Sequence, residues 1–195
     1  MARAARFTAD ELLDAALELA VEGGPAAVSI AAISRRTGAP SGSVYHRFAG
    51  REELLATLWL RTIEEFQQGM IAALAIADTD LAIDACLAHA FDWTAAHPQK
   101  TRLLLQFSAH DLVADWPESL GARVHGANRR LREAIADLAR RRFGSVTAET
   151  VDRTVYALAD LPYAAIRRHL PDGRPRPWLR EFTAATAHRV LAVGQ

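Results

Sequence analysis

The residues best suited to chemistry in this sequence gather in one short stretch between Ser29 and Arg51. These 23 residues hold four arginines and no aspartate or glutamate, whereas the whole chain of 195 residues balances 23 basic against 23 acidic side chains. A local charge of +4 suits contact with a polyanion such as the phosphate backbone of nucleic acid. A solvated charged face is the alternative that charge alone leaves open. The arginines are Arg35, Arg36, Arg47 and Arg51.

Two short helices joined by a tight turn must position this stretch. Ser29 can cap a helix that ends at Gly38, because glycine adopts a positive φ without penalty. A second short helix runs from about Pro40 to Phe48. On it, Val44 and Phe48 are four residues apart, so they share a face that can pack onto the two preceding helices. The opposite face presents polar side chains outward: Ser41, Ser43, His46 and Arg47.

An earlier helix completes a three-helix module. Thr8 and Glu11 have the spacing of a capping box, in which each side chain satisfies a free backbone donor of the other residue. Apolar residues then recur at helical spacing until a Gly-Gly-Pro run begins at Gly23. The acidic residues of this region all precede that run, so the basic charge is concentrated on the stretch that follows. They are Asp10, Glu11, Asp14, Glu18 and Glu22.

The rest of the chain keeps a helical pattern and contains no convincing strand. We expect an all-α fold of about nine helices in two domains. Residues 1–50 form a helix-turn-helix module whose recognition helix spans about 40–48, and residues 51–195 form a larger helical bundle. Pro162 lies inside one expected helix and should kink it, because proline removes a backbone donor. The expected bundle helices cover about 51–77, 79–97, 98 to before 116, 120–143, 147–170 and 177–193.

Composition and motifs exclude several classes of function. Half of the residues are hydrophobic and 24% are charged, which is typical of a globular protein. A single cysteine, Cys86, permits no disulfide within the chain. We find no signal peptide, no membrane-spanning run, no phosphate-binding loop and no recognisable metal or catalytic motif. We therefore expect a cytoplasmic protein that is not an enzyme, with no cofactor, no bound metal and no membrane partner.

The stretch from Gly38 to Leu55 resembles the signature of the TetR family. It reads Gly-Ala-Pro-Ser-Gly-Ser-Val-Tyr-His-Arg-Phe over residues 38–48 and Arg-Glu-Glu-Leu-Leu over residues 51–55. The family typically shows Gly-Val-Ser-Lys-Gly-Thr-Leu-Tyr-Xaa-His-Phe and then Lys-Glu-Xaa-Leu-Leu. The resemblance covers residues 7–55. Ser41 stands where the family often has lysine, and the histidine is shifted by one place to His46, so base preference should differ.

The resemblance implies a role for each position of the stretch. The second short helix would enter the major groove of DNA, where serine hydroxyls can reach base edges and glycine permits a close backbone approach. The tyrosine resembles one that family members direct at the phosphate backbone, and flanking residues would grip phosphates. The expected DNA-binding residues are Ser29, Arg36, Ser41, Gly42, Ser43, Tyr45, His46, Arg47 and Arg51.

Two further surfaces are expected in the bundle. Aromatic and polar residues could line a pocket for a small molecule, although ordinary core packing explains them equally well. In TetR-like proteins the last two long helices build a four-helix dimer interface. The pocket candidates are His89, Trp93, Phe107, His110 and Tyr163, and the interface candidates are Val155, Leu158, Trp178, Phe182, Thr186 and Val190.

These features predict a transcriptional regulator that binds a double-stranded DNA operator. The resemblance favours a homodimer on a pseudo-palindromic site, acting as a repressor that an unidentified small-molecule effector relieves. Two other classes stay open at this point. The same N-terminal module could contact protein in a helical adaptor, or the bundle could be the scaffold of an enzyme.

Overall fold

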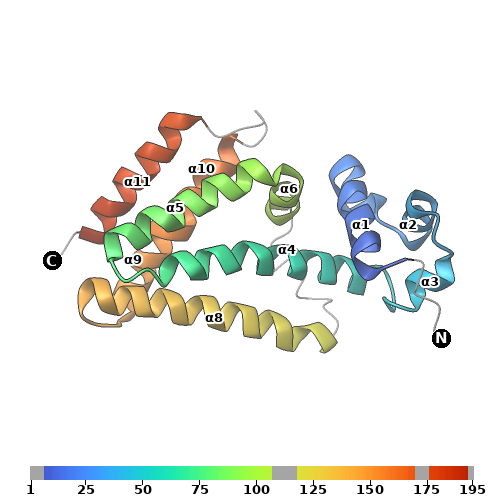
Figure 1. Cartoon of the computed structure of the whole chain (residues 1–195), viewed down its shortest axis with the longest axis horizontal. Helices are drawn as coiled ribbons and strands as arrows, with labels where there is room; N and C mark the ends of the chain where they lie inside the picture. Colours follow the sequence, from blue (N-terminus) through green and yellow to red (C-terminus); the bar gives the residue numbers. More distant parts are fainter. Residues whose placement is uncertain (1–6, 107–117, 170–175, 193–195) are drawn as a thin grey trace. The chain divides into compact units, whose positions relative to one another are not determined.

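The computed structural model describes residues 7–106, 118–169 and 176–192, and these residues form helices and connections without a strand. Figure 1 shows the helices in chain order. Nine helices are present in the described residues, because α9, the π-helical turn η2 and α10 continue into one another. The all-α prediction is thus confirmed. The elements are α1 (Ala9–Gly23), η1 (Pro25–Ala27), α2 (Ile30–Thr37), α3 (Ser41–Tyr45), α4 (Arg51–Leu74), α5 (Thr79–Ala96), α6 (Pro98–Gln106), α8 (Glu118–Phe143), α9 (Ala148–Val155), η2 (Tyr156–Asp160), α10 (Leu161–His169) and α11 (Pro177–Ala192).

The chain divides into two compact units. The first comprises residues 1–63 and 99–124, and the second comprises residues 64–98 and 125–195. Two long helices, α4 and α8, therefore each contribute residues to both units. These units group residues by contact, and the division into a DNA-binding domain and an effector domain stays a functional prediction.

The core of the first unit is built by α1, α2, α3 and the start of α4. The predicted capping box is present, since the Glu11 amide donates to Thr8 Oγ1 at 3.2 Å and the Thr8 amide donates to a Glu11 carboxylate oxygen at 2.7 Å. From this start α1 buries Leu12 and Ala16 completely. Ile33 of α2 and Val44 of α3 are equally buried in the same cluster. Three helices thus share one apolar centre, and Figure 1 shows these helices in shades of blue.

The core of the second unit lies between α5, α11 and their neighbours. Met70, Leu74, Ile83, Leu87 and Leu191 are buried in one cluster. Helix α11 packs along α5, and α10 packs against both. One face of α11 therefore packs into this core through Ala187 and Leu191.

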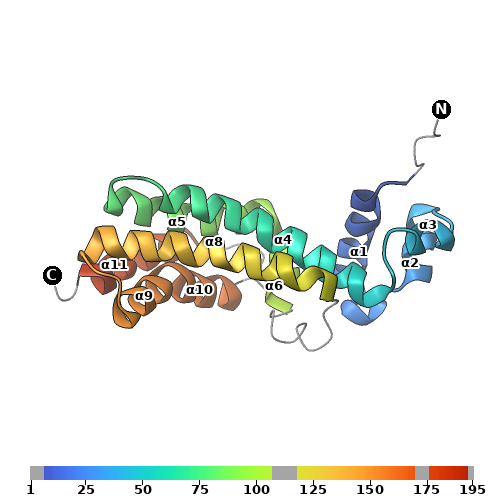
Figure 2. The same ribbon diagram turned by 90° about the horizontal axis from the view of Figure 1, so that it is seen from below.

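A π-helical turn precedes Pro162. In η2 the Leu161 amide donates to the Tyr156 carbonyl, five residues earlier, instead of the usual four. Such turns are rare and locally reset the helical register, here just ahead of a residue that has no amide donor. Figure 2 shows α9 and α10 following one another in a single run across this turn.

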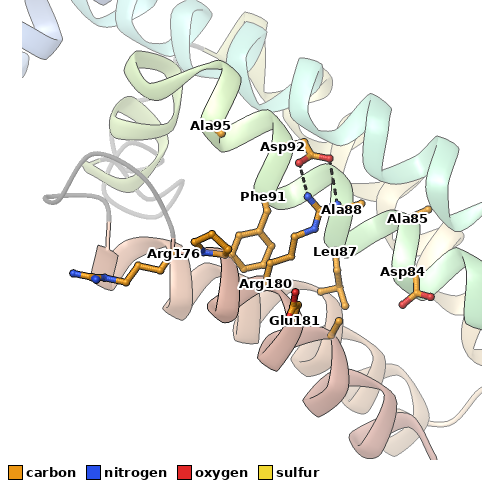
Figure 3. A pocket seen from close by; sticks show the side chains of 12 residues that line it. Asp84, Ala85, Leu87, Ala88, Phe91, Asp92, Ala95, Arg176, Arg180 and Glu181 are labelled. Atoms are coloured by element: carbon orange, nitrogen blue, oxygen red, sulfur yellow. Dashed lines mark hydrogen bonds and ion pairs between the residues drawn. The ribbon is translucent and has the colours of Figure 1, made fainter.

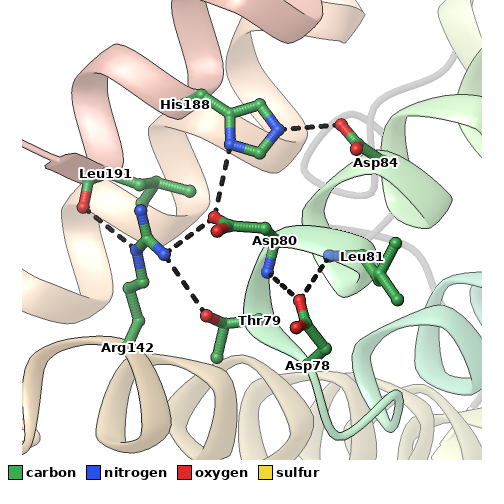
Figure 4. A network of polar contacts seen from close by, with 8 residues as sticks. All are labelled: Asp78, Thr79, Asp80, Leu81, Asp84, Arg142, His188 and Leu191. Atoms are coloured by element: carbon green, nitrogen blue, oxygen red, sulfur yellow. Dashed lines mark hydrogen bonds and ion pairs between the residues drawn. The ribbon is translucent and has the colours of Figure 1, made fainter.

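A polar network ties the end of α11 to α5 and α8 (Figure 4). His188 Nε2 lies 2.8 Å from Asp84 Oδ1, and its Nδ1 lies 3.5 Å from Asp80 Oδ1. Arg142 of α8 donates to the same Asp80 oxygen at 2.8 Å and to the Leu191 carbonyl at 3.4 Å. Asp78 completes the network by capping α5 through the amides of Asp80 and Leu81. Three helices that meet in the core are thus also joined at the surface.

None of the described helices combines the length and the apolar character needed to cross a membrane.

A close helix crossing brings Gly69 of α4 against His89 of α5. A Cβ built on Gly69 would lie 2.1 Å from His89 Cε1, so the ring occupies the space that a side chain would need. The ring is held there, because His89 Nε2 lies 2.9 Å from the Phe66 carbonyl oxygen and the Phe66 and His89 rings are 5.2 Å apart. Gly126 of α8 is the opposite case, since a Cβ there meets nothing within 4 Å.

These two glycines make a matched pair for a stability measurement. Gly69→Ala should lower the free energy of unfolding by about 1–3 kcal/mol, because overpacking displaces an anchored ring. Gly126→Ala should raise it by about 0.5–1 kcal/mol, because alanine favours a helix where space is open. Urea unfolding of both variants measures the difference. Equal stabilisation by the two alanines would show that His89 does not fix this crossing.

Candidate nucleic-acid interface

The two faces of α3 have opposite characters. Val44 is fully buried and Phe48 nearly so, both in the core with α1 and α2. Ser41, Gly42, Tyr45 and His46 are exposed on the other side, and Tyr45 presents 58% of its surface to solvent. Ser43 and Arg47 are half-buried. The predicted polar face is therefore present, and all four of its side chains, Ser41, Ser43, His46 and Arg47, reach solvent.

The recognition helix is shorter than the 40–48 predicted from the sequence. Regular helix ends at Tyr45, but the amides of His46 and Phe48 still donate to the carbonyls four residues earlier, both at 3.0 Å. Pro40 precedes the helix with φ −57° and supplies the first carbonyl acceptor to Ser43. The last turn is irregular because Phe48 must stay in the core while Ala49 and Gly50 leave the helix.

The turn between α2 and α3 is fixed by short polar side chains. Ser29 caps α2 as predicted, its hydroxyl accepting from the Ala32 amide at 3.1 Å. Gly38 adopts φ 72°, a left-handed conformation that favours glycine. Thr37 Oγ1 donates to the Ile33 carbonyl at 2.8 Å and accepts from the Ala39 amide at 3.2 Å. Ser34 and Ser41 join the two helices through their hydroxyls, 3.2 Å apart.

Arg36 lies in an ion-pair cluster with α1. Its guanidinium donates to Glu18 at 3.0 Å and to Glu22 at 2.9 Å. These bonds raise the pKa of Arg36 above its ordinary value, and the bond from Arg36 holds the pKa of the Glu22 carboxyl below its own. Arg36 was expected to grip phosphate, and the structure places it between two carboxylates instead. A phosphate contact by Arg36 stays a prediction that this pairing weakens.

The acidic residues of α1 form a row that two arginines neutralise. Asp10, Asp14, Glu18 and Glu22 are spaced by four residues, so they lie along one side of the helix and repel one another. Arg61 of α4 binds the first two at 3.1 and 2.6 Å, as Arg36 binds the last two. The i, i+4 spacing of these acidic residues was visible in the sequence and predicts that cations lie beside them, but it does not identify which arginines those are.

Arg51 also turns inward. Its Nε donates to the Val28 carbonyl and its Nη2 donates to the Pro25 carbonyl, each at 2.7 Å. Arg35 and Arg47 behave differently. Arg35 is exposed and has no ion-pair partner among the described residues, while Arg47 binds only the Ser43 carbonyl, at 2.9 Å. Arg35 was missing from the residues singled out for DNA contact, although it contributes to the same basic stretch.

Of the predicted pocket residues that the structure describes, His89 and Trp93 lie together and Tyr163 lies at the surface. Trp93 is buried beside Phe66, with ring centroids 5.2 Å apart, and its Nε1 has no hydrogen-bond partner in the described part of the chain. His89 contacts the same Phe66. Tyr163 is exposed, and its role in a ligand pocket stays a prediction. Phe107 and His110 lie outside the described residues.

A surface groove of about 730 Å³ runs between α5 and α11 (Figure 3). Leu87 and Phe91 form its apolar floor, and Arg180 crosses it to bind Asp92 at 2.7 Å. None of the predicted pocket residues lines it. Across the described residues no cluster of histidine, cysteine and carboxylate side chains is placed to hold a metal. Burial raises the pKa of the Cys86 thiol to about 12, which keeps it protonated.

The predicted interface residues divide into exposed and buried. Trp178 and Phe182 of α11 are among the most exposed large apolar side chains, at 55% and 65%. Val155, Thr186 and Val190 are half-buried. Leu158 lies in the core of its own chain, only 3% exposed, so its assignment to a dimer surface was wrong. The apolar spacing in the sequence did not show that Leu158 lies on the face of η2 that packs into the core.

Residues 12–58 match the family model described as bacterial regulatory proteins, tetR family. The match covers most of α1, all of α2 and α3, and the start of α4. These elements include α3 and the core against which its apolar face packs. Residues 12–58 therefore resemble the N-terminal segment of the TetR family.

Solved TetR-family and related regulators share the fold over nearly the whole chain. PfmR from Thermus thermophilus has 18% sequence identity and a TM-score of 0.68, covering 94% of this chain and 98% of its own. FadR from Bacillus subtilis, in complex with stearoyl-CoA, has 12% identity and a TM-score of 0.71, with 95% and 98% covered. The fatty acid degradation regulator FadR from Bacillus halodurans has 14% identity and a TM-score of 0.71, with 96% of each chain covered.

The ion pair between Arg36 and Glu22 predicts how the Glu22 carboxyl titrates. Because Arg36 depresses the pKa of Glu22, the pairing contributes stability above the ordinary carboxyl pKa and loses it as the pH falls through the depressed value. Arg36→Gln should therefore move the Glu22 midpoint upward toward its ordinary value. Carboxyl ¹³C NMR titration measures that midpoint. Arg35→Gln is the control, because the exposed neighbour should leave it unchanged; equal shifts in both variants would contradict the pairing.

Proposed function

We propose that this chain is a sequence-specific DNA-binding transcriptional regulator that acts as a homodimeric repressor. The observation that carries the proposal is the two-faced α3, which keeps Val44 and Phe48 in the core and leaves polar side chains toward solvent. The match of residues 12–58 to the model of a family of bacterial regulatory proteins supports it. A helix of this kind is what the major groove of DNA accepts.

Each exposed residue of α3 has a role in this proposal. Ser43 and His46 read base edges, since both can donate and accept hydrogen bonds at the groove floor. Tyr45 and Arg47 bind phosphates, and Arg35 of α2 joins them as a cation with no carboxylate partner within the described residues. Gly42 has open space around its absent side chain, which suits close approach of a DNA strand.

Base recognition by Ser43 and His46 can be measured by selecting binding sites from a randomised duplex. Alanine at either position should relax preference at a defined base pair by about 1–3 kcal/mol, because one specific hydrogen-bonding partner is lost. Arg35→Ala is the control, since a phosphate contact should weaken binding to all sequences alike. If both α3 variants select the same motif as the parent, they do not read bases.

Dimerisation is supported by an aromatic surface on η2, α10 and α11. We define it by four side chains that are each about half exposed or more: Tyr156, Tyr163, Trp178 and Phe182. The ring centroids of Trp178 and Phe182 are 6.5 Å apart in an edge arrangement, and those of Trp178 and His169 are 6.3 Å apart. Large exposed aromatics in one region are typical of a protein–protein interface. Two-fold pairing would place two α3 helices on a pseudo-palindrome.

The aromatic surface predicts the effect of a charge at its centre. Phe182→Asp should yield monomers in sedimentation velocity and lose operator binding, because a carboxylate would be buried without a partner. Leu81→Asp is the control, since Leu81 is also exposed, at 60%, but lies on α5 outside the aromatic surface. Helix content by circular dichroism should stay unchanged in both. Dimers that persist in the Phe182 variant would place the interface elsewhere.

A small-molecule effector is the third part of the proposal. The indole Nε1 of Trp93 is a buried donor without an acceptor in the described structure, and such a donor suits a ligand that carries an oxygen acceptor on an apolar body. The stearoyl-CoA bound to the Bacillus subtilis FadR is a molecule of that general character. An effector would have to bind the DNA-free conformation more tightly than the DNA-bound one to relieve repression.

The adaptor and enzyme alternatives have weaker support. Cations beside serine and histidine side chains suit contact with the phosphates and bases of DNA. The family match is also to regulatory proteins, which favours DNA binding over an adaptor role. The half-buried His89 of the second unit contacts the Phe66 carbonyl oxygen, and its ring fills the space that a side chain at Gly69 would need, which is a packing role.

A further inference from the structure

Arg51 stands where a cation is electrostatically unfavourable. It is the first residue of α4, and the N-terminus of a helix carries partial positive charge that favours acidic side chains. Glu52 and Glu53 follow it and satisfy that preference. An arginine at this position therefore calls for acceptors outside the helix, either on DNA or within the protein.

The acceptors present are two backbone carbonyls ahead of α2. Nε of Arg51 donates to the Val28 oxygen and Nη2 donates to the Pro25 oxygen, both at 2.7 Å, while Nη1 lies 3.8 Å from a Glu52 carboxylate oxygen. Pro25 opens the 3₁₀ turn η1, and Val28 is the fully buried residue that ends it. One planar guanidinium thus bridges both ends of the connection between α1 and α2.

This bridge acts on the helix that carries α3. Val28 is followed directly by Ser29, whose hydroxyl caps α2 at the Ala32 amide. Further along α2, Ser34 meets Ser41 at the start of α3. A displacement of Val28 would therefore move the cap of α2 and, through the two hydroxyls, the first residue of the recognition helix.

We propose that Arg51 is a positioning residue for DNA recognition, which fixes the start of α2, and does not itself bind phosphate. The proposal rests on the DNA-binding function proposed above and revises the phosphate contact expected from the sequence. To reach a phosphate with Nε and Nη2, Arg51 would have to release the carbonyl of a buried residue, and a polar group left without its partner is costly.

Two variants separate positioning from phosphate contact. Arg51→Lys keeps the charge but cannot form the same bidentate bridge, and Arg51→Ala removes both. If Arg51 positions α2, both should weaken operator binding about tenfold or more while changing affinity for a random-sequence duplex less than about twofold. The slope of log operator affinity against log salt concentration should be the same in both variants as in the parent protein. Arg47→Ala is the matched control, because loss of a phosphate contact lowers that slope by about 0.9 for each contact removed.

Amide hydrogen exchange measures the bridge without DNA. In both Arg51 variants the amides of Ala32 and Ile33, which depend on the Ser29 cap, should exchange about tenfold faster than in the parent protein. The proposal is overturned if exchange there is unchanged, or if Arg51→Lys binds operator like the parent while Arg51→Ala loses salt slope. If the parent protein selects no DNA at all, the proposed function fails, and exchange alone still decides whether Arg51 holds α2.

Discussion

Burial of Val44 and Phe48 is the constraint on which the rest of the recognition module depends. These side chains occupy a centre shared with α1 and α2, and they leave α3 only one orientation about its own axis. Every polar residue of that helix is then directed toward solvent by exclusion from the core. The helix is short, so local hydrogen bonds alone would not hold it. Its form comes from tertiary packing and from the turn at Gly38.

The arginines around this core have two roles: some bind groups within the protein, and others are free of carboxylate partners among the described residues. The acidic row of α1 is neutralised by Arg36 and Arg61, which tie α1 to α2 and α4. Arg51 bonds to backbone carbonyls, so it uses its donors inside the module while keeping its charge. Arg35 and Arg47 then supply cations that carboxylates do not neutralise within the described residues. Within the basic stretch, Arg36 and Arg51 thus hold helices together, while Arg35 and Arg47 are the cations that we propose for DNA contact.

Much of this module could be predicted from the sequence, because its signals are local. The Thr8–Glu11 cap, the Ser29 cap, the turn glycine and the i, i+4 apolar pair on α3 all depend on residues close in the chain. The partners of Arg36 and Arg51 could not be predicted in the same way, because they lie 14 to 26 residues away and depend on how helices cross. For the same reason, apolar spacing could not tell that Leu158 faces its own core while Phe182 faces solvent.

The central claim is that the solvent face of α3 contacts DNA, and amide chemical shifts measure this most directly. Titrating the ¹⁵N-labelled full chain with a duplex recovered by selection should shift the amides of residues 41–47 and of Arg35 most. Residues of the acidic row on α1 should shift least, since their carboxylates repel phosphate and are already paired. Large shifts confined to α1 or to the bundle, with α3 unchanged, would contradict the account.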